Sequence, residues 1–560
     1  MPGSSVVSPR GASFLCEPGV ARVRGLPDPW GATDLGAVLD AAARWQPGKV
    51  ALAHGEQALT FGDLGRQAEA LAGGLERLGI RPGSPTVVLM DNRPEWVVTF
   101  FALAMVGSPI VPLNPRFVPR EMAYVLEHSG AGCLVASDRF GRTTLAERLA
   151  ELAPAIEGQG RELRLDRFPH LHHVVRLGGE RPLPWASDWA RLLEGGRATA
   201  RQGGPASVGL IQYTSGTTGF PKGVMLRQDQ ILRNAWCVGA RLGLRPTDVM
   251  YSPMPFFHVG GAVLSILFTV QRGATLIVPD RFDPEHMLDT IEREACTVTA
   301  GVETMFRRLM DHPRYERFAG ASLRAGWGAG PREIFDRLPG FVNIYGLSEN
   351  SPNAAMAFFD EPLARRRDSC GWIQPGMELG IARAERFENE WLPLGERGEI
   401  RIRGWGVMQG YLNDADTTAR TVSRDGWLHT GDFGAIDVDG AVHFLGRMKD
   451  TIRVGGEVVG AGEIEAVLAR HPKVRSVYVV GIPDPFYGEV PIAWVVSADG
   501  ADIERELMHL AQEQLAKFKV PRHVRLCLDA DLPITESGKV QKYVLRDRFL
   551  AEAGERGRRP

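Results

Sequence analysis

Lysine is scarce in this chain of 560 residues, although positive charge is not. Only eight of the 65 basic residues are lysines: Lys49, Lys222, Lys449, Lys473, Lys517, Lys519, Lys539 and Lys542. An arginine-biased, GC-rich genome accounts for most of this scarcity. Even so, a chain that uses arginine by default makes each remaining lysine a candidate for a specific role.

The chain also lacks an excess of charge of either sign. Lys+Arg 65 against Asp+Glu 67 gives a formal net charge of -2. Such a balance excludes a chain built around nucleic acid or an anionic membrane surface. The hydrophobic share of 44% is that of a globular protein, which excludes disordered and fibrous classes. The length is enough for about three or four domains.

Cysteine is sparse and scattered, and no two cysteines form a CxxC pair: Cys16, Cys133, Cys237, Cys296, Cys370 and Cys527. This spacing indicates neither a disulfide scaffold nor a cysteine zinc site. It fits a reducing compartment, and we expect a cytoplasmic protein.

Long apolar runs are missing as well. The longest, Val97 to Val106, is stopped by Gly107 and is shorter than the roughly 20 residues that a membrane-spanning helix needs. The first 25 residues lack the apolar core of a signal peptide. The tail from Glu555 to Pro560 matches no lipidation or peroxisomal signal. We therefore expect no transmembrane segment.

What the chain does contain is an alternation of helix-like and strand-like segments. Helical spacing of apolar residues runs from Asp63 to Leu78 and from Glu95 to Met105. Strand-like runs lie between and after them, at Thr86–Met90, Ile110–Leu113 and Gly132–Ala136. This alternation predicts an α/β fold whose sheets are largely parallel.

The character of the sequence changes from about residue 369. Short strand-like runs separated by glycine turns, such as Gly398–Arg403 and Val442–Leu445, predict a small β subdomain. After about residue 449 a compact α+β unit follows, with helices at 463–470 and 504–517 and strands at 474–480 and 492–496. Residues 1–34 are expected to form a loosely ordered leader.

The sharpest local signal is the segment Tyr213–Gly223, which reads YTSGTTGFPKG and follows the strand-like run Val208–Gln212. Its glycines allow backbone N–H groups to face an anion, its four hydroxyls add donors, and Lys222 adds a compact positive charge. It is not a Walker A loop, because Pro221 precedes the lysine and Gly223 follows it. A flexible linker is the alternative, but linkers rarely follow a buried strand directly.

This segment resembles the phosphate loop of the acyl-adenylate-forming enzymes, which include acyl-CoA synthetases, 4-coumarate–CoA ligases, adenylation domains and firefly luciferases. The resemblance covers roughly residues 35 to 547. Further motifs follow in the family's order: Met254–Gly261, Tyr345–Glu349, Trp427–Asp432, Gly446–Arg453 and Pro533–Lys539.

The resemblance implies a reaction in two steps: a carboxylic acid and ATP give acyl-AMP and pyrophosphate, and coenzyme A then takes the acyl group. Joining the carboxylate to AMP supplies the good leaving group that it lacks. The first step brings an anionic nucleophile to a polyanion, so positioned cations and Mg²⁺ are needed. The implied cofactors are ATP, Mg²⁺ and coenzyme A.

The resemblance also implies an ATP site. The residues that match the family's phosphate, adenine and ribose positions are Thr214, Ser215, Gly216, Thr217, Thr218, Gly219, Lys222, Gly328, Ala329, Gly330, Asn343, Ile344, Tyr345, Gly346, Ser348, Asp432 and Arg447. Glu349, with Thr214, would hold Mg²⁺. The chain departs from the family at Ser348, usually threonine, and in the turn from Trp327 to Pro331.

Three residues are implied in catalysis. Lys539 would bridge the carboxylate and the α-phosphate during adenylation. His258 would gate the acyl site, although a histidine in an apolar run is more often a core residue. Lys449 would be the hinge about which a small domain turns.

The acyl pocket is predicted from Trp236, His258, Val302, Trp327 and Leu347, and whether Trp327 walls the pocket or fills the core stays open. Family members that activate amino acids usually carry an aspartate near His258. No acidic residue lies between Tyr251 and Gln271. An apolar fatty, aromatic or cyclic acid is therefore favoured over an amino acid.

The resemblance also implies a domain division, because family members turn a small C-terminal domain between the two steps. Residues 35–447 would form the adenylation domain, 448–450 the hinge, and 451–560 a mobile domain that would present Lys539 first and then the CoA residues Arg453, Gly455 and Gly456. The main alternative is a relative that performs one half-reaction or loads a separate carrier protein. Oxidative light chemistry stays open, and a non-catalytic nucleotide-binding protein is disfavoured. The sequence leaves open a monomer or a homodimer.

Overall fold

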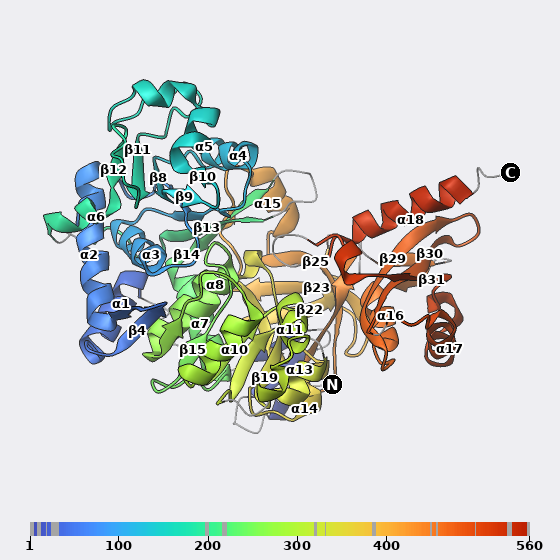
Figure 1. Cartoon of the computed structure of the whole chain (residues 1–560). Helices are drawn as coiled ribbons and strands as arrows, with labels where there is room; N and C mark the ends of the chain where they lie inside the picture. Colours follow the sequence, from blue (N-terminus) through green and yellow to red (C-terminus); the bar gives the residue numbers. More distant parts are fainter. Residues whose placement is uncertain are drawn as a thin grey trace.

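The structure is a computed structural model. It describes residues 33–196, 201–214, 221–318, 322–330, 332–383, 388–448, 451–454, 457–498, 500–534 and 540–556, together with strands at 5–7, 13–17 and 20–23. A large part built from several sheets carries a smaller C-terminal part on one side, drawn in orange to red in Figure 1.

One sheet of the large part is parallel except at one edge. Its order is β12 (Ala186–Asp188), β11 (His173–Leu177), β8 (Cys133–Ser137), β6 (Thr86–Leu89), β7 (Ile110–Pro112), β13 (Val208–Thr214), β14 (Lys222–Arg227) and β24 (Gly410–Tyr411). Strand β14 is antiparallel to both of its neighbours. The short strands β9 (Arg139–Phe140) and β10 (Thr143–Thr144) pair separately.

A second sheet is parallel in its centre. Its order is β21 (Trp372–Ile373), β20 (Asn353–Met356), β19 (Phe341–Gly346), β18 (Ala325–Gly328), β17 (Val298–Gly301), β15 (Val249–Tyr251), β16 (Thr275–Ile277), β4 (Val50–His54) and β5 (Gln57–Thr60). The antiparallel pairs are at its two ends. The predicted α/β class with largely parallel sheets is confirmed.

Helices fill the space between and around these sheets (Figure 1). Their bounds are α1 (Leu35–Trp45), α2 (Phe61–Leu78), α3 (Pro94–Val106), α4 (Pro119–Ser129), α5 (Leu145–Leu152), α6 (Trp189–Leu192), α7 (Gln228–Arg241), α8 (Val259–Gly261), α9 (Phe268–Arg272), α10 (Pro284–Arg293), α11 (Glu303–Met310), α12 (Tyr315–Phe318), α13 (Arg332–Arg337), α14 (Leu363–Asp368) and α15 (Ala415–Thr421). A continuous apolar core joins α1–α3, α7 and α9 to both sheets.

Helix α2 shows how local sequence fixes an element. Thr60 and Asp63 form a reciprocal capping box at its start, which satisfies backbone N–H groups that lack helical partners. Gly79 ends it in the left-handed conformation, with φ of 101°. The predicted helix from Asp63 to Leu78 is therefore confirmed, with two more residues at its beginning.

A third, antiparallel sheet corresponds to the predicted β subdomain. Its order is β1 (Ser5–Val7), β2 (Ser13–Glu17), β3 (Val20–Val23), β22 (Met377–Ala382), β23 (Arg397–Gly404), β25 (Trp427–Ile436) and β26 (Val442–Arg447). Three of these strands lie within residues 1–34, where a loose leader was expected.

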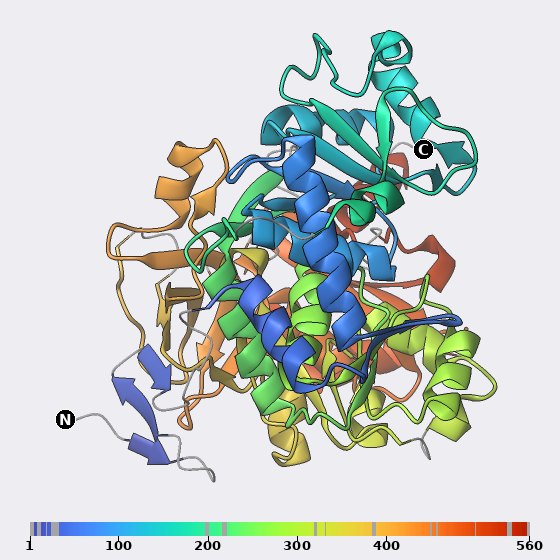
Figure 2. The same cartoon turned by 90° about the vertical axis from the view of Figure 1, so that its left-hand side faces the viewer.

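The leader expectation is corrected for these three strands. Strand β3 extends the edge of β22, with Ala21 opposite Leu379, and Ala21 is buried there. Figure 2 shows the dark-blue strands beside the later strands of this sheet. The partner strand is more than 350 residues away in sequence, so local composition could not indicate the pairing.

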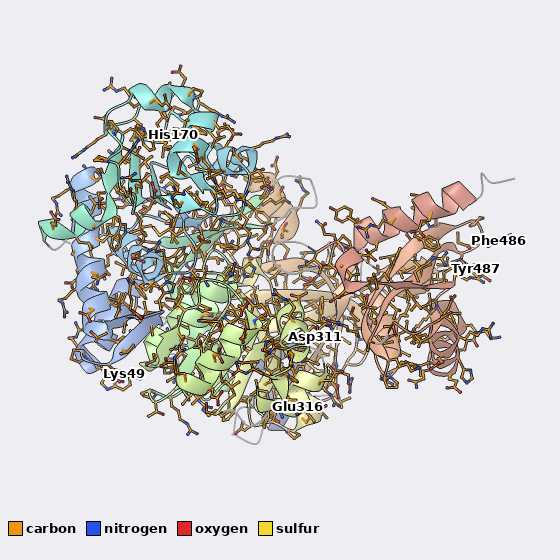
Figure 3. The ribbon with its side chains drawn as sticks, in the orientation of Figure 1. Lys49, His170, Asp311, Glu316, Phe486 and Tyr487 are labelled. Carbon is orange, nitrogen blue, oxygen red and sulfur yellow. The ribbon has the colours of Figure 1, made fainter. Side chains whose placement is uncertain are left out.

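The C-terminal part has its own core. Its elements are β27 (Ile452–Val454), β28 (Glu457–Val459), α16 (Ala461–Leu468), β29 (Val474–Asp484), β30 (Gly488–Ser497), α17 (Glu504–Gln514), β31 (His523–Cys527) and α18 (Lys542–Arg556). The β29–β30 turn carries the exposed rings of Phe486 and Tyr487, which Figure 3 labels at the outer end of this part.

Among the described residues, two ion pairs connect the C-terminal part to the rest of the protein. Glu463 of α16 pairs with Arg397 of β23, and Arg475 of β29 pairs with Asp311. Asp311, which Figure 3 labels, lies just after α11. Both pairs are partly solvent-exposed, and such pairs contribute only about 0–1 kcal/mol each. They connect the two parts without fixing them strongly.

The described residues also bear on membrane-spanning helices and on disulfides. None of their helices has both the length and the apolar character that a membrane crossing requires. No disulfide joins the described cysteines, and Cys133, Cys296 and Cys370 are buried.

Candidate functional site

A buried carboxylate lies where three of the predicted motifs meet. Asp432 is 1% exposed and accepts a hydrogen bond from the hydroxyl of Tyr345, at 2.8 Å between Oδ2 and the hydroxyl oxygen. Its Oδ1 lies 3.0 Å from Nε of Arg447, which faces it across strands β25 and β26. Burial, followed by the charge of Asp432, raises the pKa of Tyr345 well above its ordinary value, so the hydroxyl remains a donor.

A second carboxylate, Glu349, lies on a 3₁₀ turn (η4, Ser348–Asn350) after β19. Its Oε1 accepts a hydrogen bond from the hydroxyl of Tyr411 at 2.9 Å. Lys222, the first residue of β14, places its Nζ 5.1 Å from the centre of the same Tyr411 ring. Tyr411 therefore contacts both a predicted metal ligand and the lysine of the predicted phosphate loop.

The two ends of that loop are held by helix α4. Tyr213 is the first residue of the loop segment, and its hydroxyl lies 2.8 Å from Nδ1 of His128. Pro221 lies near the other end of the segment, and its carbonyl accepts from the hydroxyl of Tyr124 at 3.0 Å. The rings of Tyr124 and His128 stack, with centroids 5.4 Å apart. Thr214 and Lys222 sit opposite each other at the loop's base.

The His258 segment lies beside the start of the same loop. The amide of Gln212 donates to the carbonyls of Tyr213 and Phe257, at 3.2 and 3.1 Å. His258 caps α8, because its Nδ1 accepts from the N–H of Gly260 at 3.1 Å. A π-helical turn (η3, Ala262–Leu267) follows, a feature that often occurs at functional sites. The structure thus brings the two motifs together.

The predicted acyl residues separate into groups. A Cβ added at Gly260 would lie 3.3 Å from His258 Nδ1 and 3.6 Å from the tip of the Trp327 ring, so these two side chains approach the same glycine. Val302 packs against the same core as Trp327. Leu347 packs against a different core, and the ring of Trp236 stacks on the guanidinium of Arg272, 3.5 Å from the ring centre.

The predicted adenine residues lie on β18, β19 and the turn between β18 and α13. Gly328 has φ of 149°, and a Cβ there would lie 1.8 Å from the carbonyl oxygen of Gly301, so only glycine fits. Asn343 borders a cavity of about 400 Å³ between the large and C-terminal parts. Ala329, Gly330, Ile344 and Gly346 lie nearby on these same elements, and Ser348 begins η4.

Phe444 covers the ring of Tyr345. The two rings stack with centroids 5.5 Å apart, and Phe444 is 44% exposed although it is a large apolar side chain. Phe444 also borders the cavity that Asn343 lines. A flat ligand on this side would meet an aromatic surface.

Several predicted residues lie outside the described ones: Ser215, Gly216, Thr217, Thr218, Gly219, Lys449, Gly455, Gly456 and Lys539. Arg453 belongs to β27, but its side chain is outside the description. Their predicted roles stay predictions.

The described residues contain no group of three His, Cys, Asp or Glu side chains that could hold a metal ion. Mg²⁺ commonly binds through one or two carboxylates, substrate phosphates and water. Glu349 suits such a site, since it forms no ion pair with a described cation. The residues present therefore fit a metal carried in with a polyphosphate.

The sequence reasoning missed the residues that support the site, among them Tyr124, His128, Gln212 and Tyr411. Their partners lie 45 to 97 residues away along the chain. Nothing in their local sequence indicates these contacts. Only the sheet order, which places β24 next to β14, brings Tyr411 to Lys222.

The chain matches known protein families. Residues 39–412 match the family model described as AMP-binding enzyme, and residues 463–539 match the AMP-binding enzyme C-terminal domain. The first match alone covers more than half of the chain.

Individual relatives cover nearly the whole chain. A feruloyl-CoA synthase of an Amycolatopsis species is 35% identical, over 90% of this chain and 97% of its own. The mitochondrial medium-chain acyl-CoA ligase ACSF2 of Rattus norvegicus is 31% identical, over 92% and 87%.

A solved structure is similar as well. ATP-bound MatB from Rhodopseudomonas palustris has a TM-score of 0.78 and 26% identity, and the match covers 92% of this chain and 99% of that one. The chain therefore belongs to the AMP-binding enzyme family, and it is an AMP-forming acid–CoA ligase.

Proposed function

We propose that the protein is an acyl-CoA synthetase acting in two steps at one site. A carboxylate oxygen attacks the α-phosphorus of ATP, so that acyl-AMP forms and pyrophosphate leaves. The sulfur of coenzyme A then attacks the acyl carbon, the thioester forms, and AMP leaves. Adenylation makes the acyl carbon reactive, because AMP is a far better leaving group than oxide.

The observation that carries this proposal is the arrangement around Asp432. Tyr345 and Arg447 hold a carboxylate that is almost fully buried, and ionised carboxylates are rarely buried without such partners. A carboxylate accepts hydrogen bonds at two oxygens, which suits the two neighbouring hydroxyls of a ribose. Arg447, which is 42% exposed, can also reach a phosphate oxygen.

Glu349 would hold Mg²⁺, with Thr214 as a second candidate ligand. When bound, the ion would neutralise charge on the phosphates and polarise the phosphorus under attack. Lys222, at the end of the phosphate loop, adds a positive charge beside the same tyrosine, Tyr411, that contacts Glu349. Together these residues would lower the repulsion between two anions.

We propose that the acid is apolar rather than an amino acid. Support comes from the surroundings of Gly260, which the side chains of Met254, His258 and Trp327 all approach, and Met254 and Trp327 belong to the apolar core. No carboxylate lies on the segment from Tyr251 to Gln271, so an α-ammonium group would find no partner there. Burial of an unpaired charge is strongly unfavourable.

The two steps need different groups at the same carbon, and we propose that the C-terminal part turns about Lys449 between them. Lys539 would serve adenylation, and the strand of Arg453 with Gly455 and Gly456 would serve thioester formation. The exposed ion pairs between the two parts support such an exchange, because pairs of this kind are weak.

The test is a pyrophosphate-release screen across fatty, aromatic and polycyclic acids, followed by CoA-dependent formation of AMP and thioester. We expect Lys539→Ala to reduce adenylation about 10²- to 10³-fold, as loss of one preorganised contact to a developing charge does. Thioester formation from a supplied acyl-AMP should change far less. Lys473→Ala, an exposed lysine on the same domain, is the matched control.

The outcomes separate the alternatives. Equal losses in both half-reactions would contradict the turning domain. Pyrophosphate release without CoA-thioester would favour a relative that performs one half-reaction or loads a carrier protein. Absence of pyrophosphate release with every acid would refute the proposed function.

A further inference from the structure

The inference rests on the proposed function and concerns Tyr411, a residue that no predicted motif contains. It lies on β24, which pairs with β14 so that Tyr411 sits opposite Val224. Tyr411 is 8% exposed. The backbone around it is tied to the phosphate-loop strand, because the N–H of Leu412 donates to the carbonyl of Gly223 at 2.8 Å.

The position of Tyr411 relative to Glu349 is fixed twice. The tyrosine hydroxyl donates to Glu349 Oε1 at 2.9 Å. The N–H of Met408, three residues before the tyrosine, donates to the backbone carbonyl of Glu349, also at 2.9 Å. Both the carboxylate and the backbone of Glu349 are therefore held by the same short segment.

The ring of Tyr411 contacts the second charged group. Nζ of Lys222 lies 5.1 Å from the ring centre, within the range in which an ammonium is attracted to an aromatic face. Among the described residues neither Lys222 nor Glu349 forms an ion pair. The two opposite charges thus contact one tyrosine, through its face and its hydroxyl, and are not paired with each other.

This separation matters for the chemistry. A direct Lys222–Glu349 pair would neutralise the cation meant for phosphate and the anion meant for the metal. An ionised carboxylate only accepts hydrogen bonds, so the Tyr411 hydroxyl is the donor in this contact. A donor to one oxygen of a ligating carboxylate orients the carboxylate.

We propose that Tyr411 is a positioning residue of the ATP site: its hydroxyl orients Glu349 toward the metal, and its ring holds Lys222 toward the phosphates. It touches neither substrate nor metal in this role. Its effects should therefore appear through Glu349 and Lys222 and should be separable by variants that remove one contact at a time.

The primary test measures binding rather than turnover. Mn²⁺ binding to the enzyme–ATP complex is followed by electron paramagnetic resonance, and ATP binding without metal by calorimetry. Tyr411→Phe keeps the ring and removes the hydroxyl, so we expect metal affinity to fall about tenfold or more, as for other partners of metal ligands. Metal-free ATP affinity should stay within twofold. Tyr487→Phe on the exposed β29–β30 turn is the matched control.

A second pair of variants tests whether the effect passes through Glu349. In a Glu349→Gln background, Tyr411→Phe should cause no further loss of metal affinity, because the carboxylate it orients is gone. Tyr411→Leu also removes the ring, and we expect it to weaken metal-free ATP binding several-fold. Thermal melts of each variant test whether it is folded.

The inference is overturned if Tyr411→Phe leaves Mn²⁺ affinity unchanged. It is also overturned if, in the double variant, the loss of Mn²⁺ affinity caused by Tyr411→Phe adds in full to the loss caused by Glu349→Gln. A folded Tyr411→Leu variant with unchanged metal-free ATP affinity would overturn the part of the inference in which the ring holds Lys222 toward the phosphates. Failure of the proposed function would be seen in the wild type and not only in the variants. The wild type itself would then release no pyrophosphate and would bind no Mn²⁺ with ATP, and the inference would be refuted as well.

Discussion

The hydrogen bond from Tyr124 of helix α4 to the phosphate loop allows a prediction about ATP binding. In Tyr124→Phe the ring remains and the hydroxyl that donates to the Pro221 carbonyl is lost. A hydrogen bond of this kind contributes about 0.5–1.5 kcal/mol, which corresponds to about a two- to tenfold change in an equilibrium constant. We therefore expect the KM for ATP to rise by about that factor.

We expect the KM for ATP to change, and not the KM for the acid, because of where the Tyr124–Pro221 hydrogen bond lies. Pro221 directly precedes Lys222, at the exit of the loop, whereas the segment of His258 is tied to the loop's entry through Gln212. The KM for the acid should thus stay within about twofold. Acid-dependent pyrophosphate exchange, with ATP and acid varied separately, measures both values.

Tyr487→Phe serves as the control, because it makes the same chemical change on an exposed turn. If the control raises the KM for ATP as much as Tyr124→Phe does, the effect is not specific to the loop. The reasoning would be refuted if Tyr124→Phe raised both KM values equally, or if it changed neither while the thermal stability fell.

Three further predictions concern stability. Arg241 is fully buried and donates to the backbone carbonyls of β20 and β21, so Arg241→Met should cost about 3–5 kcal/mol in urea unfolding. Burial lowers the pKa of His128 from 6.5, so the unfolded chain binds more protons just below that pH. The wild type should then lose more stability than His128→Asn as the pH falls from about 6.5. Phe486→Ala, at 91% exposure, should change stability by no more than about 0.5 kcal/mol, against about 3–5 kcal/mol for buried Phe268→Ala by calorimetry.

The lysines illustrate how far sequence reasoning reached. Lys222 was singled out from its rarity and from the loop around it, and the structure gives it a contact to Tyr411. Lys519 and Lys542 had no predicted role, and both form ion pairs within the C-terminal part, with Glu463 and Glu465. These pairs join elements that are distant in sequence, so no local pattern could indicate them.

The acyl pocket shows the opposite case. The predicted pocket residues were treated as one group, yet Leu347 packs against a different core from Val302 and Trp327, and Trp236 stacks on Arg272. Apolar side chains follow the same burial rule in a pocket wall and in a core. Composition alone therefore cannot separate them.

The sequence by itself determined the α/β class, several helices and strands, and the family of the chain. These features depend on local periodicity, on caps such as Thr60 with Asp63, and on short motifs whose chemistry requires particular residues. Local terms act between neighbours in the chain, so they can be read before the chain folds.

The tertiary structure alone decided which side chains support the site. Tyr345 and Asp432 are 87 residues apart, and Glu349 and Tyr411 are 62 apart. Their meeting depends on the order in which the strands pair, and so does the pairing of β3 with β22. That order is set by burial of the whole core, which no single segment of sequence contains. The scarce lysines therefore indicated one end of the site, and the fold supplied the tyrosine that connects Lys222 to Glu349.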